Sequence, residues 1–75
     1  MRVRVRYFAV LREQRGKSED WEELPAGCTA SAAYALLCPP AQLPVGYAVN
    51  QDYVVGTTEL REGDELVFLP PLGGG

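Results

Sequence analysis

The stretch that decides the fold is Glu65-Leu66-Val67-Phe68-Leu69, followed by Pro70-Pro71 and then by Leu72-Gly73-Gly74-Gly75. Residues 65–69 present apolar side chains on both faces of a predicted strand, which indicates a central place in a sheet. The prolines fix φ and lack amide donors, so the strand must end before them. The glycines have no Cβ atom and cannot hold a fixed shape alone. We therefore predict a domain over residues 1–69 and an extended tail over residues 70–75.

The opening of the sequence predicts another strand and a short helix. Arginines and apolar residues alternate over residues 2–7, and this period of two is typical of a strand with one buried face and one basic, solvated face. Because the alternation begins at once, we expect no signal peptide. Residues 8–15 have the apolar spacing of a helix, and Gly16 stands where a helix cap belongs.

A mixed alternation over residues 18–24 predicts a strand that pairs back against the first one. We place Trp21 on its packed side and expect its acidic residues to face the arginines, where each cross-strand pair contributes about 0.2–1 kcal/mol. Lys17, in the preceding turn, has no companion acid, base or cofactor motif in the sequence. We therefore expect a solvated lysine and not a catalytic one.

The main helix is predicted over residues 30–38. Thr29 is a candidate N-cap, and the alanines favour a helix. Pro39-Pro40 would end it. Tyr34 is expected to pack in the core. The apolar stripe that should lie on the sheet comprises Ala33, Leu36 and Leu37.

The remaining strands complete a small mixed sheet. Strands are predicted over residues 45–50 and 53–55, with Asn50 and Asp52 in a turn that tolerates left-handed φ. Gly63 suits the turn before the last strand. The first and last strands are expected to be parallel neighbours, joined through a helical crossover. This order predicts an α+β fold of the β-grasp type, with a mixed sheet of four to five strands and one main helix packed on one face.

Composition and charge exclude several classes of protein. Seventy-five residues make one small domain, and an apolar content of 47% is too high for a disordered chain. No apolar run approaches the roughly 20 residues of a membrane helix. A net charge of −3 disfavours nucleic-acid binding. We expect a cytoplasmic protein with neither a membrane nor a nucleic-acid partner.

The sequence offers no catalytic or metal-binding set of side chains. It contains no histidine, so serine–histidine and cysteine–histidine pairs cannot form within it. Cys28 and Cys38 lack the spacing of a zinc site and are expected to be buried or half-buried thiols. No glycine-rich loop joins a strand to a helix, as phosphate binding would require. The chain alone is therefore not predicted to be an enzyme, and its candidate working group is the carboxylate of Gly75.

Residues 63–75 resemble the carboxyl-terminal signature of the molybdopterin synthase small subunit family, the ubiquitin-like sulfur carriers. That signature is a Gly-Asp-Glu turn, an apolar strand, Pro-Pro, an apolar residue, a variable residue and Gly-Gly, with Gly73 in the variable position. Residues 3–13 resemble the family's opening strand and helix, and residues 48–50 its third-strand turn. Residues 38–40 replace a longer helix and connection, so the sequence departs from the family there.

The resemblance implies a carrier that works through its carboxyl terminus and binds no cofactor of its own. An E1-like activating enzyme would use ATP to adenylate Gly75, and a sulfur donor system would convert it to a thiocarboxylate. The tail would then enter the large molybdopterin synthase subunit and give its sulfur to the cyclic pyranopterin precursor of the molybdenum cofactor. In this reading, the residues that thread partner active sites are Pro70, Pro71, Leu72, Gly73 and Gly74, and those that dock the partner are Phe68 and Leu69.

Two alternatives stay open at this point. Related ubiquitin-like carriers serve thiazole synthesis, transfer-RNA thiolation or cysteine synthesis, and some act as protein modifiers through an isopeptide bond. Residues 7–13 favour the molybdopterin branch among these. A protein of a different class, a non-catalytic β-grasp interaction module with an inert tail, would share the same fold.

Overall fold

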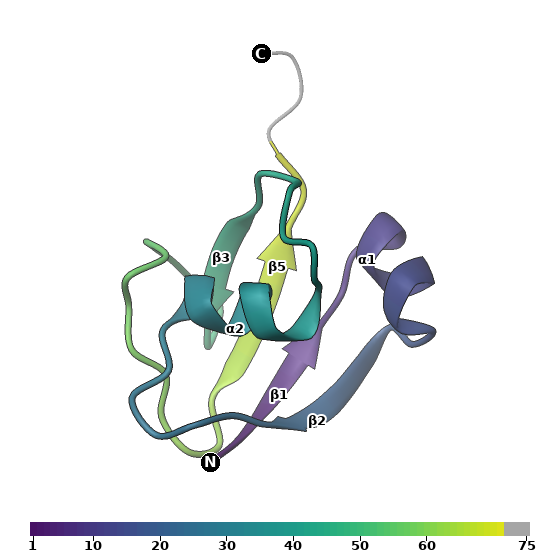
Figure 1. The fold of residues 1–75 in the computed structure, drawn as a ribbon. Helices are drawn as coiled ribbons and strands as arrows, with labels where there is room; N and C mark the ends of the chain where they lie inside the picture. Colours follow the sequence, from purple (N-terminus) through teal and green to yellow (C-terminus); the bar gives the residue numbers. More distant parts are fainter. Residues whose placement is uncertain (72–75) are drawn as a thin grey trace.

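A mixed sheet of five strands and two helices form the body of the computed structural model, which describes residues 1–71 (Figure 1). The strand order is β2-β1-β5-β3-β4, with β5 parallel to β1 and antiparallel to β3. The predicted α+β β-grasp fold and its central last strand are confirmed. Leu72, Gly73, Gly74 and Gly75 lie outside the described residues. The elements are β1 (Arg2–Arg6), α1 (Ala9–Arg15), β2 (Glu19–Glu23), α2 (Ala30–Leu37), β3 (Gly46–Val49), β4 (Asp52–Val54) and β5 (Glu65–Leu69).

The core lies between the sheet and α2, which crosses one face of it in Figure 1. Val3 and Val5 of β1 are fully buried, and the alternating arginines are exposed, as the period of two predicts. Leu66 and Phe68 are buried on β5 next to them. Removing these apolar side chains from water is the dominant favourable contribution to folding.

Strand β2 forms as predicted, but its side chains face the other way. Trp21 pairs with Arg4, so it lies on the outer face of the sheet and is 45% exposed; the prediction of a packed Trp21 was wrong. The guanidinium carbon of Arg2 lies 5.0 Å from the Trp21 ring centroid. Glu19 lies on the same face as Trp21 and is 3.0 Å from Arg4 Nη2 and 3.9 Å from Arg6 Nε. Asp20 and Glu22, which a packed Trp21 would have turned toward the arginines, pair instead with the buried Val5 and Val3. Both faces of this strand carry acidic residues, so the pattern alone could not orient it.

The caps of both helices agree with the predictions. Gly16 ends α1 with φ of 74° and donates its backbone N–H to Arg12 O at 2.8 Å. Thr29 Oγ1 accepts the Ala32 N–H at 3.1 Å at the start of α2. This hydrogen bond satisfies one of the amide groups that a helix leaves unpaired at its start.

The buried stripe of α2 differs from the predicted one. Leu36 is 57% exposed, so its assignment to the sheet-facing stripe was wrong, whereas Leu37 is buried as predicted. The buried residues recur at the i, i+3, i+4, i+7 spacing of a helix face. Tyr34 packs in the core as predicted, and its hydroxyl donates to Leu43 O at 2.8 Å. The buried residues of α2 are Ala30, Ala33, Tyr34 and Leu37.

Left-handed backbone closes the predicted turns. Asn50 and Gln51 have φ of 51° and 73°, while Asp52 already belongs to β4. Gly63 has φ of 84° in the turn before β5. Asn50 also joins the two turns, because its amide donates to Asp64 Oδ1 at 2.9 Å and its oxygen accepts from Glu65 N at 3.0 Å. These bonds hold the start of β5 in register.

Candidate functional site

The central strand β5 positions the base of the carboxyl-terminal tail. Leu69, its last residue, pairs with Gly46 of β3, and Val67 pairs with Arg6 of β1. After Leu69 the chain leaves the sheet through Pro70 and Pro71, both exposed, at the end opposite the amino terminus (Figure 1). Because β5 is hydrogen-bonded to β1 on one side and to β3 on the other, it is a rigid support for the residues that follow Leu69.

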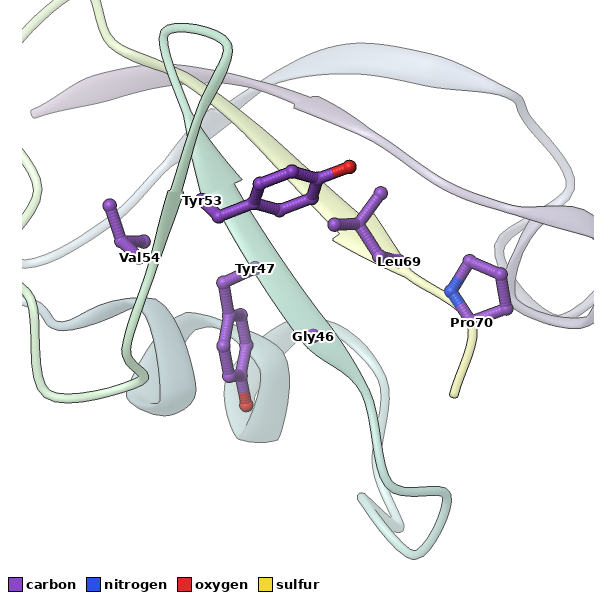
Figure 2. A pocket seen from close by; sticks show the side chains of 6 residues that line it. All are labelled: Gly46, Tyr47, Tyr53, Val54, Leu69 and Pro70. Carbon is purple, nitrogen blue, oxygen red and sulfur yellow. The ribbon is translucent and has the colours of Figure 1, made fainter. Parts of the chain in front are cut away.

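A shallow apolar groove of about 710 Å³ lies at the base of the tail. Figure 2 shows Tyr53 and Leu69 on one side of β3, with Tyr47 pointing away from them. The Tyr53 side chain belongs to the edge strand β4, and the residue is 87% exposed. A Cβ atom at Gly46 would lie 3.6 Å from Leu69 Cβ. Because glycine has no Cβ, this part of the groove stays open. The groove is lined by Gly46, Tyr47, Tyr53, Val54, Leu69 and Pro70.

The two residues predicted to dock a partner lie in different environments. Leu69 is half-buried and lines the groove beside Pro70. Phe68 is 1% exposed, so its ring cannot contact a partner protein, and its assignment as a docking residue is corrected to a core residue. Its ring centroid lies 5.3 Å from that of Tyr34 and 5.9 Å from that of Tyr7.

Sequence reasoning missed the four groove residues that come from β3 and β4, which are Gly46, Tyr47, Tyr53 and Val54. Their contribution depends on pairing between β5 and β3 and between β3 and β4, which brings residues distant in sequence together. One local signal was present: Tyr53 alternates with Asp52 and Val54 on a short strand that also lies at an edge. An aromatic residue on the open face of an edge strand is exposed unless something covers it.

A cluster of polar side chains around Glu22 links β2 to both helices. The Tyr7 hydroxyl donates to Glu22 Oε2 at 2.7 Å, and Arg15 Nη2 donates to the same oxygen at 3.0 Å. Burial opposes the charge on Glu22, but hydrogen bonds from Tyr7, Lys17 and Arg15 outweigh it and lower the pKa of Glu22. Arg15 Nη1 also donates to Leu37 O at the end of α2, at 3.1 Å. The cluster holds an acidic residue on the inner face of β2.

The two thiols are not poised for chemistry. Cys28 and Cys38 are free and buried, as predicted. Burial raises the pKa of both thiols, which disfavours the reactive thiolate. Over residues 1–71 the structure contains no cluster of acidic residues and cysteines able to hold a metal ion. Within the same residues, neither helix is long and apolar enough to cross a membrane.

A mixed five-stranded sheet, a helix across one face and a carboxyl-terminal extension of the central strand define a ubiquitin-like β-grasp domain. The chain belongs to the ThiS family, whose model matches residues 5–75. A molybdopterin synthase sulfur carrier subunit of Chlamydomonas reinhardtii is 36% identical, and the match covers 100% of both chains. The protein of the same name from Drosophila yakuba is 35% identical, with 97% of this chain and 90% of the relative covered. The resemblance seen in the sequence is confirmed.

Solved structures agree with this assignment. A Pyrococcus furiosus protein assigned as molybdopterin converting factor subunit 1 has a TM-score of 0.80 and 28% identity, covering 96% of this chain and 99% of its own. A chain in the complex of subunits 1 and 2 of the Helicobacter pylori molybdopterin-converting factor has a TM-score of 0.62 and 22% identity, with 100% of both chains covered. At 22% identity, the Helicobacter pylori chain shows a similarity of fold alone.

Proposed function

We propose that this chain is the sulfur carrier subunit of a molybdopterin synthase and that the Gly75 carboxylate carries the sulfur. The observation that carries the proposal is the placement of β5: the sequence that ends in Gly73-Gly74-Gly75 continues from the central strand, through two prolines, at a free end of the sheet. Relatives named as sulfur carrier subunits along the full length of the chain support it.

The proposed chemistry takes place at the terminal carboxylate. A carboxylate is a poor acyl electrophile, so an E1-like activating enzyme first spends ATP to form an acyl adenylate at Gly75. A sulfur donor system then displaces AMP, which leaves a thiocarboxylate. Glycines 73–75 have no side chains, so they fit a narrow channel in a partner enzyme. In the large synthase subunit, the thiocarboxylate would give its sulfur to the cyclic pyranopterin precursor of the molybdenum cofactor.

We also propose that the chain supplies no catalytic side chain. The sequence has no histidine, the thiols Cys28 and Cys38 are buried, and the Tyr7 hydroxyl is committed to Glu22. The groups that adenylate Gly75 and transfer its sulfur then belong to partner proteins of the cytoplasm. The Helicobacter pylori complex of subunits 1 and 2 supports a large-subunit partner.

Intact mass spectrometry tests the proposal directly. Purified protein incubated with an activating enzyme, ATP and a sulfur donor is expected to gain the mass difference between sulfur and oxygen, because one terminal oxygen is exchanged. Fragmentation should place the change at Gly75. If an activating enzyme that loads other carriers leaves this chain unchanged, the sulfur-carrier function is rejected.

The groove at the base of the tail is expected to bind the large subunit. Tyr53→Ala removes an exposed ring that contributes nothing to the core, so folding should be unchanged. Loss of a central aromatic contact typically costs a complex about 2 kcal/mol, or about 30-fold in Kd. Titration calorimetry with the large subunit measures this loss. Val55→Ala is the matched control, since Val55 is 69% exposed and does not line the groove; equal effects of both variants would refute a role for the groove.

A further inference from the structure

Strand β2 is one edge of the described sheet, with β1 as its neighbour on one side only. An edge strand carries a row of backbone N–H and C=O groups that can pair with a strand of another chain. β2 has five residues, whereas the opposite edge strand β4 has three. β2 is therefore the edge at which an added strand would form more hydrogen bonds.

The pairing with β1 shows which residues of β2 direct their backbone groups outward. At one end the Tyr7 N–H donates to Ser18 O, and at the other the Leu24 N–H donates to Met1 O, both at 2.8 Å. Hydrogen-bonded residues alternate along an antiparallel pair, so the even-numbered residues from 18 to 24 direct N–H and C=O toward β1. Trp21 is then the centre of the outward row. The residues whose N–H and C=O groups point away from β1 are Glu19, Trp21 and Glu23.

The outward N–H at the centre of this row is already occupied. Asp20 Oδ1 accepts the Trp21 N–H at 2.8 Å, so a carboxylate takes the donor that an added strand would need. The other carboxylate oxygen, Oδ2, lies 2.8 Å from Lys17 Nζ. Lys17 was predicted to be solvated, yet its side chain is only 31% exposed, and Nζ also lies 3.1 Å from Glu22 Oε2. Lys17 thus fixes the Asp20 carboxylate where it covers the edge.

A second copy of β2 is the partner whose backbone fits this edge. Antiparallel pairing about a two-fold axis at Trp21 sets Trp21 opposite itself, so each Trp21 N–H faces the Trp21 carbonyl of the other copy. The Trp21 side chain is 45% exposed on the outer face, and the pairing would bring the two rings together there. Glu19 of one copy would face Glu23 of the other, and like charges directly opposite each other are destabilising. Self-pairing is therefore favoured by the backbone and the rings, and opposed by the flanking charges and by both Asp20 carboxylates.

We propose that the Asp20 carboxylate, held by Lys17, closes the β2 edge against strand pairing with a second copy of the chain. The Trp21 N–H has one hydrogen, so both copies must release it from Asp20 before they can pair. The inference concerns β2 alone and does not depend on the function proposed for the carboxyl terminus. The apolar groove lies at the opposite side of the sheet, on β3, β4 and β5, so closing β2 leaves the groove accessible.

Asp20→Ala is expected to turn a monomer into a dimer. Asp20 is exposed, so its truncation should leave the fold intact. Without Asp20, a symmetric pair no longer has to break two hydrogen bonds to charged groups. Each such bond changes an equilibrium constant by about tenfold, so the Kd of self-association should fall by about 100-fold. Sedimentation equilibrium over a concentration series measures this Kd for the variant and for wild type.

Trp21, the only tryptophan of the sequence, reports where the two copies meet. In the Asp20→Ala dimer, the Trp21 N–H should exchange with deuterium more slowly than in the dilute, monomeric variant. The indole fluorescence should change over the same concentration range, because pairing removes water from the ring. A dimer that shows neither change meets through another surface, and it would overturn the inference.

Glu23→Ala is the matched control, because it removes one negative charge from the same strand and leaves the Asp20 hydrogen bond in place. The Glu23 side chain is 75% exposed, and this variant should stay as monomeric as wild type. If Glu23→Ala associates as tightly as Asp20→Ala, charge and not the hydrogen bond controls the edge, and the inference fails. It also fails if Asp20→Ala stays monomeric or if wild type associates as tightly. Asp20→Val, with a β-branched residue that suits a strand, carries the same expectation and serves if Asp20→Ala does not fold.

Discussion

A chain that lacks Gly75 is expected to fold normally and to accept sulfur at least 100-fold more slowly than the intact chain. Deletion still leaves a Gly-Gly terminus, so the variant changes the length of the tail and not its chemistry. One residue fewer withdraws the acyl carbon by about 3.3 Å, and a misplacement of about 1 Å at a reacting centre costs on the order of 100-fold. Intact mass after timed incubation with activating enzyme, ATP and sulfur donor measures the rate.

The control for this deletion keeps the length of the tail. Gly73→Ala alters the position that is variable in the family signature and should load at close to the wild-type rate. Thermal unfolding of all three proteins should coincide, because the hydrogen-bonded part of β5 ends at Leu69. If the shortened chain loads as fast as Gly73→Ala does, Gly75 is not the residue that carries the sulfur.

Phe68→Ala is expected to remove about 3–5 kcal/mol from the free energy of unfolding, the usual cost of deleting a buried aromatic ring. The Phe68 ring is 1% exposed and is packed against Tyr7, Tyr34 and Tyr47, at centroid distances of 5.9, 5.3 and 6.1 Å. The free energy of unfolding of a native protein is only about 5–15 kcal/mol in total. Urea denaturation followed by circular dichroism measures the loss.

Leu69→Ala separates the core role from the docking role. Leu69 is half-buried and lines the groove, so its truncation should cost less stability than Phe68→Ala and should weaken binding of the large subunit. A Phe68→Ala protein as stable as wild type would contradict the assignment of Phe68 to the core. A Leu69→Ala protein with unchanged affinity for the large subunit would remove Leu69 from the docking surface.

Local pattern was sufficient to predict most of the fold. The period of two in β1, the cap residues Gly16 and Thr29, and the apolar last strand all act through neighbours in sequence, and each is where it was predicted. The parallel pairing of β1 with β5 followed from the right-handed crossover rule. The strand period and the caps need no knowledge of distant contacts, and the crossover rule supplies the one distant pairing among these features.

The errors arose where distant contacts decide which way a side chain faces. Trp21 is the most apolar residue of its strand, yet Glu22 takes the inner face because Tyr7 and Arg15 supply hydrogen bonds from other elements. Phe68 and Leu69 are both apolar, so their strand shows no polar face that would tell the core side from the groove side. The tail residues 72–75 lie outside the described structure, and their threading role stays a prediction.

The parallel pairing of β1 with β5 also bears on how the protein is made. The ribosome synthesises β5 after the other four strands of the described sheet, so the central position of that sheet is unfilled until β5 has been made. A nascent chain that stops before β5 lacks the strand on which Leu66 and Phe68 complete the core. Such a chain exposes apolar surface and is a substrate for chaperones and proteases. Cellular quality control would therefore remove chains whose sheet is incomplete.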